Sequence, residues 1–252
     1  MRRRRPGIHL LDPSPSPTLQ WGAIVEDVDD PGAEMVVVST PGATAVEWDV
    51  SVRNRTVAED NPAYPPTDPV IVTVYKGQMD EKWPYYGGHR TLPLSDIGSE
   101  FGLRSYSFPE SRLRVVGRVS LPRVPIEDVR PSPYHSRSFS VEGNEEFIES
   151  TRKEGVPLGA PLVREMDGYF EIVNGHKRLW VSQVAGLNEI PVQVFRYDDR
   201  RAADLWAKHH FHTYTKDEQQ AALNRLIDDF GMGVFDELYH LERSDWVVGD
   251  ES

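Results

Sequence analysis

The stretch YFEIVNGHKRL, residues 169–179, decides how the second half of this chain is expected to fold. Its first five residues are mostly apolar and predict a strand, which Asn174 and Gly175 end. A helix is predicted to begin at His176 and to stop at Gly186. The first amide hydrogens of such a helix are unpaired and lie at the positive end of its dipole. The stretch therefore predicts a binding site for an anion such as phosphate.

Two basic side chains, Lys177 and Arg178, occupy the first turn of this helix. Cations are unfavourable there for the helix alone, because they face the positive end of its dipole. Basic residues at a position that is unfavourable for the helix itself usually bind an anion there. The alternative is that both residues are solvated charges on an exposed helix start.

The neighbouring segments alternate between helix and strand, which is typical of an α+β domain. The expected elements, in chain order, are a helix between Asn144 and Gly155, strands at 161–164 and 169–173 joined by a turn at Asp167-Gly168, the helix at 176–185, a strand at 190–196 and helices at 199–208, 216–230 and 234–241.

The first half of the chain has a different pattern, with Val-, Ile- and Thr-rich runs separated by turn residues. Strands are expected at 23–28, 34–39, 44–52, 70–75 and 112–119, with an insertion at 77–110 that holds one short helix at 93–101. This pattern predicts a small, mostly antiparallel β domain of unknown role over residues 19–119.

The insertion carries an aromatic group formed by Trp83, Tyr85 and Tyr86, close to Arg90. If these rings are exposed, they could stack on a base or a sugar. The structural alternative, which we favour, is that they anchor a long loop to the domain beneath it.

Composition limits the partners that this chain can have. It has 252 residues, a net charge of -12, 22 arginines, six lysines and no cysteine. The charge argues against non-specific coating of duplex DNA, so any nucleic-acid contact must be local. A high-salt cytoplasm would suit this acid-rich composition, and a GC-rich genome explains the arginine bias equally well. Disulfides and cysteine chemistry are excluded.

The first 18 residues begin with Arg2 to Arg5 and continue into a Pro- and Ser-rich segment, so we expect a disordered arm. No apolar region follows the basic cluster, as an export signal would require, so a cytoplasmic protein is expected. No apolar run approaches the roughly 20 residues that span a bilayer, so no membrane contact is expected.

Three segments in order, 124–137, 154–164 and 174–187, resemble the opening and the first two conserved boxes of ParB N-terminal domains. By this resemblance the chain is identified as a member of the ParB/sulfiredoxin superfamily. The resemblance implies an α+β fold with a ParB-like nucleotide-binding domain at 120–214. The β domain would precede it, and C-terminal helices at 215–252 would follow.

In that family the second box grips the phosphates of a nucleotide, which is CTP in the partition proteins. The resemblance implies a nucleoside triphosphate, CTP or ATP, bound with Mg²⁺. The implied phosphate-binding residues are Gly175, His176, Lys177, Arg178 and Arg137, with Gly155, Pro161, His209 and His210 as secondary candidates. His176 stands where the partition proteins carry glutamate, which leaves the identity of the nucleotide open.

The sequence also departs from family patterns. The missing cysteine rules out sulfiredoxin activity, and residues 207–212 lack the Glu-Asn-x-x-Arg motif of partition proteins. No helix-turn-helix is expected before Ser252. His209, His210 and His212 suggest a metal site, but no acidic residue has a recognisable ligand spacing with them. We therefore expect no metal ligand and favour histidines that are satisfied or face phosphate.

Three functional hypotheses follow. The leading one is a nucleotide-binding switch or DNA-associated accessory factor of a plasmid, virus or mobile element, with DNA or a DNA-bound protein as a further partner. The first alternative is a nuclease or nucleotide-dependent phosphotransferase, for which Glu165, Asp167 and Glu171 are metal-ligand candidates by proximity in sequence. The second alternative is an interaction module without a ligand. Enzyme activity and oligomeric state stay open.

Overall fold

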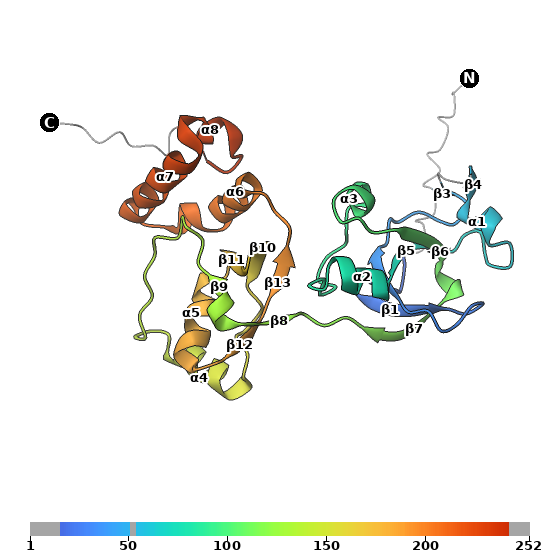
Figure 1. Cartoon of the computed structure of the whole chain (residues 1–252), viewed down its shortest axis with the longest axis horizontal. Coiled ribbons are helices and arrows are strands. Elements are labelled where there is room, and N and C mark those ends of the chain that lie inside the picture. The colour runs from blue at the N-terminus through green and yellow to red at the C-terminus, as the bar shows by residue number, and fades with distance from the viewer. Residues whose placement is uncertain (1–15, 51–53, 242–252) are drawn as a thin grey trace, which may run out of the picture. The chain divides into compact units, whose positions relative to one another are not determined.

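The computed structural model describes residues 16–50 and 54–241, and the chain divides after Ser120 into two compact units (Figure 1). Residues 1–15 of the expected arm and residues 242–252 of the expected C-terminal segment lie outside the described residues. None of the described helices is long and apolar enough to cross a membrane.

The first unit is built on a five-stranded antiparallel sheet in the order β6-β5-β2-β1-β7. Its strands are β1 (Ala23–Asp27), β2 (Met35–Ser39), β5 (Val70–Tyr75), β6 (Ser105–Pro109) and β7 (Leu113–Arg118). The remaining elements are the short hairpin β3 (Asp49–Val50) and β4 (Arg55–Thr56), the helices α1 (Val57–Asp60), α2 (Lys76–Lys82) and α3 (Leu94–Ser99), and the 3-10 helix Glu110–Arg112. The expected antiparallel β architecture is therefore present.

Two parts of the expected strand pattern are wrong. Of the strand expected at 44–52, residues 51 and 52 lie outside the described residues, and only Asp49–Val50 of the rest is a strand. The Glu47 carboxylate accepts hydrogen bonds from the amide and hydroxyl of Thr44 and closes a turn before it. The insertion at 77–110 contains more regular structure than expected, since α2 lies at its start and β6 pairs with β5.

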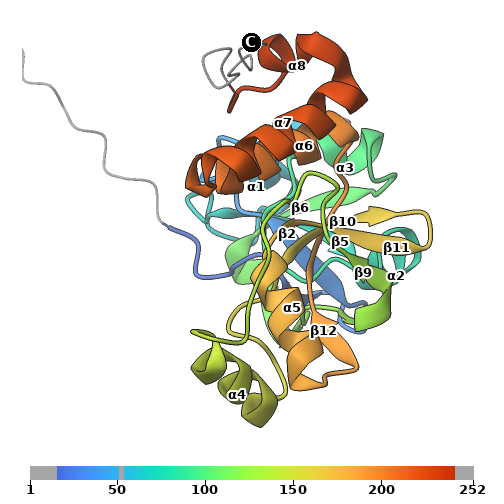
Figure 2. The ribbon, with the colours of Figure 1, turned by 90° about the vertical axis from the view of Figure 1, so that its left-hand side faces the viewer.

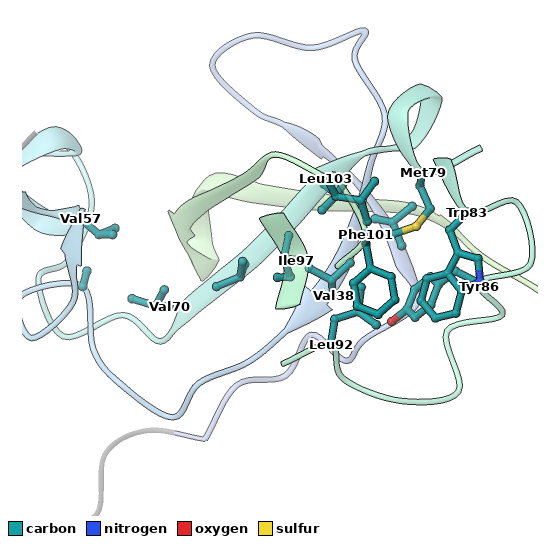
Figure 3. Packing of buried hydrophobic residues seen from close by; sticks show 14 residues of the cluster. Val38, Val57, Val70, Met79, Trp83, Tyr86, Leu92, Ile97, Phe101 and Leu103 are labelled. Atoms are coloured by element: carbon teal, nitrogen blue, oxygen red, sulfur yellow. The ribbon is translucent and has the colours of Figure 1, made fainter. Parts of the chain in front are cut away.

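The core of the first unit includes three aromatic residues of the insertion, which are Trp83, Tyr86 and Phe101 (Figure 3). Trp83 is fully buried and stacks on Phe101, with ring centroids 4.8 Å apart and planes 6° apart. Tyr86 is buried beside it, and Tyr85 is partly buried against the same cluster. The hypothesis that these rings are exposed and stack on a base or a sugar is therefore wrong. The alternative, in which they anchor the loop to the domain beneath it, is confirmed. Burial of large rings anchors the loop.

The second unit contains a four-stranded sheet in the order β13-β10-β11-β9. Its strands are β9 (Val129–Arg130), β10 (Leu162–Met166), β11 (Tyr169–Asn174) and β13 (Gln193–Phe195), and a separate pair is formed by β8 (Arg123–Pro125) and β12 (Glu189–Pro191). The β10–β11 hairpin is antiparallel, whereas β13 and β9 run parallel to their neighbours. Strands and helices thus form the expected α+β fold.

The helices of the second unit lie at its two ends, with α4 and α5 at one and α6 to α8 at the other (Figure 2). They are α4 (Glu145–Glu154), α5 (His176–Ala185), α6 (Asp199–His210), α7 (Lys216–Phe230) and α8 (Val234–Glu237), with 3-10 helices at Ile126–Asp128, Phe211–Thr213 and Gly231–Gly233.

The expected helix at 176–185 has the bounds of α5, and α4 ends on a left-handed Gly155 as expected. The expected strand at 190–196 is divided, because β12 pairs with β8 while β13 pairs with β10. The last expected helix is shorter and ends at Glu237.

Candidate anion-binding pocket

The turn between β11 and α5 depends on a glycine. Gly175 has a φ of 109°, in the left-handed region that residues with a side chain rarely adopt. A Cβ on this residue would lie 2.8 Å from the Cβ of Pro161 and 2.9 Å from its Cα. The chain therefore approaches Pro161 so closely that only glycine fits, and α5 starts directly after this contact.

A pocket of about 360 Å³ opens at the start of α5. Its size falls within the usual range for sites that bind small molecules, roughly 300–1,000 Å³. The pocket is lined by His135, Arg137, Phe139, Phe147, Leu158, Asn174, Gly175, His176, Lys177, Arg178, His210 and Tyr214.

The charges of this lining favour an anion. Arg137, Lys177 and Arg178 are its cations, and none of its residues is an aspartate or glutamate. Among the first amides of α5, that of Arg178 donates to the Gly175 carbonyl at 2.9 Å, which leaves the amides of His176 and Lys177 for an anion at the same wall. Side-chain cations and a helix start thus meet around one space, which is the arrangement that proteins use for phosphate groups.

The three cations are held in different ways. The Nε of Arg178 donates to the carbonyl oxygen of Leu158 at 3.1 Å, and the Nζ of Lys177 lies 5.8 Å from the ring centre of Phe147. Arg137 lies over the Tyr214 ring at 4.5 Å and forms an ion pair with Glu218 at 3.3 Å. An anion that used Arg137 would have to compete with the Glu218 carboxylate.

Three histidines form a packed group at the same pocket. The rings of His135 and His176 are stacked with centroids 3.9 Å apart, and His210 lies edge-on to His176 at 5.2 Å. Burial lowers the pKa of His135 and of His210 to about 4, and it lowers the pKa of His176 well below 6.5. All three imidazoles are therefore neutral at pH 7.

A hydrogen bond fixes the tautomer of His176. Its Nε2 accepts from the amide of Ser132 at 3.0 Å, so the neutral ring carries its proton on Nδ1. Nδ1 of His176, Nε2 of His135 and Nε2 of His210 are buried and have no hydrogen-bond partner among the described residues. Since these nitrogens are buried, the direct donors at the pocket surface are the cations and the helix amides.

Part of the chain matches a known family. The model of the ParB N-terminal domain matches residues 112–207, which include β11, the Gly175 turn and α5. Residues 112–207 are a ParB N-terminal domain. The resemblance of the three sequence segments to ParB N-terminal domains is therefore confirmed.

The chain is similar to curated ParB proteins over part of its length. It is 32% identical over 154 residues to a probable chromosome-partitioning protein ParB of Xylella fastidiosa, covering 56% of this chain and 49% of that protein. It is 40% identical over 81 residues to the probable chromosome 1-partitioning protein ParB of Deinococcus radiodurans, covering 32% and 28%. The chain thus spans less than half of each of these relatives.

A solved structure of C-terminally truncated ParB from Caulobacter crescentus, complexed with CTP-gamma-S, has 26% sequence identity to this chain. The match covers 45% of this chain and 68% of that one, with a TM-score of 0.32.

The fold of the second unit places most of the expected phosphate-binding residues around one pocket. Gly175, His176, Lys177, Arg178 and Arg137 all line it, as does the secondary candidate His210. Pro161 does not line it but packs on Gly175. Gly155 ends α4 and His209 is exposed, and neither belongs to the lining.

Several lining residues of the pocket were not expected from the sequence. They are His135, Phe139, Phe147 and Tyr214, whereas Asn174 belongs to the turn predicted as the anion site and Leu158 to the loop between Gly155 and Pro161. The proximity of His135 to Arg137, in a segment already singled out, was a usable signal. No signal in the sequence indicated Tyr214, because it reaches the pocket only through the packing of α6 and α7 against the 131–137 loop.

The carboxylates considered as metal ligands are engaged away from the pocket. Glu171 is buried and pairs with Arg164 at 2.9 Å, and Glu165 contacts Arg196 at 3.4 Å. Asp167 is exposed in the β10–β11 turn. Within residues 16–50 and 54–241, no group of three His, Asp or Glu residues has a geometry that could hold a metal ion.

Proposed function

We propose that the ParB domain of this chain binds the phosphates of a nucleoside triphosphate, CTP or ATP, at the start of α5. The observation that carries the proposal is the pocket itself, in which the amides of a helix start, Lys177 and Arg178 meet without any lining carboxylate. Bound Mg²⁺ would have to be held by the phosphate oxygens, since the lining offers no acidic ligand.

The phosphate chain fits the donors that are present. The α5 amides would take one phosphate group, Lys177 would act as a point charge, and the fork of Arg178 would form paired hydrogen bonds. Phe139 and Phe147 supply apolar surface on the same wall, against which the rest of the ligand could pack.

At the level of the whole protein, we propose a cytoplasmic, DNA-associated factor or switch whose state depends on the bound nucleotide. The names of its curated relatives, which are chromosome-partitioning proteins, support this setting. A contact with DNA or with a DNA-bound protein would have to be local, because the chain carries a net charge of -12. Origin in a plasmid, virus or mobile element stays a prediction, and no specific observation favours a nuclease or phosphotransferase.

Calorimetric titration with CTP, ATP, GTP and UTP, with and without Mg²⁺, tests the proposal. We expect one nucleotide to bind and Arg178→Ala to abolish the signal. Lys177→Ala should weaken binding about tenfold, whereas Lys153→Ala, which removes the same charge from exposed α4, should have no effect. Unchanged binding in Arg178→Ala would overturn the site, and absence of binding to all four nucleotides would overturn the function.

A further inference from the structure

Arg178 has a partner that a phosphate contact alone does not require. Its Nε donates to the backbone carbonyl oxygen of Leu158, in the segment between α4 and β10. The Leu158 side chain is 83% exposed, so the contact is made by the backbone. A loop 20 residues away in sequence thus holds the guanidinium.

The next residue sets the direction of that carbonyl. Gly159 has a φ of 76°, in the left-handed region. Rotation about this φ turns the Leu158–Gly159 peptide group relative to the rest of the loop, so the carbonyl points at Arg178 only while Gly159 keeps this conformation. A residue that resists positive φ would redirect the carbonyl.

The guanidinium lies between two glycines. A Cβ on Gly159 would lie 3.5 Å from the Nε of Arg178 and 3.7 Å from its Nη2. A Cβ on Gly175 would lie 3.1 Å from Nη1, so this end of the side chain reaches back to the first turn of its own helix. Because Nε is already bonded, the two Nη groups are the donors left for an anion there.

We propose that the Leu158–Gly159 turn is a positioning element that holds Arg178 with both Nη groups directed at an anion at the start of α5. The inference rests on the proposed function, because it assigns this turn a role in the same phosphate site. A side chain that is held before the ligand arrives loses less entropy on binding, which corresponds to about a three- to tenfold gain in affinity.

Nitrogen-15 NMR of the Arg178 Nε–H in the ligand-free protein tests the anchor directly. We expect slow hydrogen exchange in the native chain and fast exchange in Gly159→Ala. Gly159→Asn should keep the protection, since asparagine tolerates left-handed φ and an added Cβ would make only ordinary contacts. Gly168→Ala is the matched control, because Gly168 has a φ of 79° and no atom within 4 Å of an added Cβ.

Titrations with CTP, ATP and inorganic tripolyphosphate test the consequence for binding. Gly159→Ala should weaken binding three- to tenfold, whereas Gly159→Asn and Gly168→Ala should stay within about twofold of the native chain. In an Arg178→Lys background, which has no Nε–H, Gly159→Ala should cause no further loss. A purely structural role of Gly159 would weaken binding equally in both backgrounds.

The outcomes separate this inference from the proposed function. If the native chain binds none of the three ligands, the function fails, and the exchange of the Nε–H still decides whether the turn holds Arg178. If the Nε–H exchanges fast in the native chain, the inference is overturned. It is also overturned if Gly159→Ala and Gly159→Asn weaken binding equally.

Discussion

The imidazole rings of His135 and His176 lie face to face, with centroids 3.9 Å apart and planes within 2° of each other. Two protonated rings at this distance would repel each other strongly, and burial already disfavours a single charge. The stacking therefore excludes a doubly protonated pair, and burial favours the neutral form of both rings. The pocket thus combines a neutral aromatic group with cations at its surface.

These neutral histidines predict that the protein loses stability in mild acid. The folded-state pKa of His135 and His210 is about 4, below the ordinary value of 6.5, and that of His176 is also lowered. The unfolded chain therefore binds more protons as the pH falls from 6.5 towards 4, and stability is lost over this window. We expect a loss of about 1 kcal/mol at pH 5.5 for each of His135 and His210.

Urea unfolding at pH 7.5 and 5.5 measures this loss of stability. NMR titration of the imidazole protons identifies which histidines cause it. His89 in the first unit also has a pKa lowered to about 4 by burial, so both units should weaken. A midpoint that titrates near 6.5 for His135 and His210 would contradict the prediction.

Removing the charge of Glu218 should strengthen anion binding. Its carboxylate lies 3.3 Å from the Nη2 of Arg137 and competes with a phosphate group for that cation. Because ion pairs that stay partly accessible to solvent contribute up to about 1 kcal/mol, we expect Glu218→Gln to tighten nucleotide binding two- to fivefold. Glutamine can still complete the capping box with Thr215 at the start of α7, so the fold should be kept.

The matched control is Glu149→Gln on α4, because Glu149 forms an exposed pair with Arg152 and does not line the pocket. Equal affinities of the Glu218→Gln and Glu149→Gln proteins would show that Arg137 does not contact the ligand.

Gly175→Ala should damage both stability and binding. The new Cβ would overlap Pro161 at 2.8 Å in a backbone conformation that alanine disfavours. We expect a loss of about 1–3 kcal/mol in the free energy of unfolding, together with loss of nucleotide binding. Thermal melting and calorimetry check the two effects. Gly168→Ala, which has the strained φ without the overlap, should melt closer to the native chain and bind normally.

Trp83→Ala should destabilise the first unit by about 3–5 kcal/mol, because it removes a fully buried ring that stacks on Phe101. Faster hydrogen exchange of the β2 and β5 amides would report this loss. Trp21→Ala is the comparison, since Trp21 is 37% exposed and should cost less than about 1 kcal/mol. Exchange rates that match in the two variants would show that the Trp83 ring does not anchor the insertion.

The local elements around the pocket could be predicted from the sequence. The β11–Gly175–α5 turn, the end of α5 at Gly186 and the end of α4 at Gly155 all follow from apolar periodicity and glycine positions within short windows. The role of Lys177 and Arg178 at the anion site was predictable as well, because the effect of basic residues on a helix start is local.

Only the tertiary structure determined which other residues reach the pocket and in what state. Tyr214 and Glu218 approach Arg137 because α7 packs on the 131–137 loop, where Arg225 donates to the carbonyl of His135. The charge of Arg137 is therefore partly compensated, which its position in the sequence did not indicate. Such contacts join segments about 80 residues apart, and they depend on packing and burial, which periodicity and spacing within a short window do not encode.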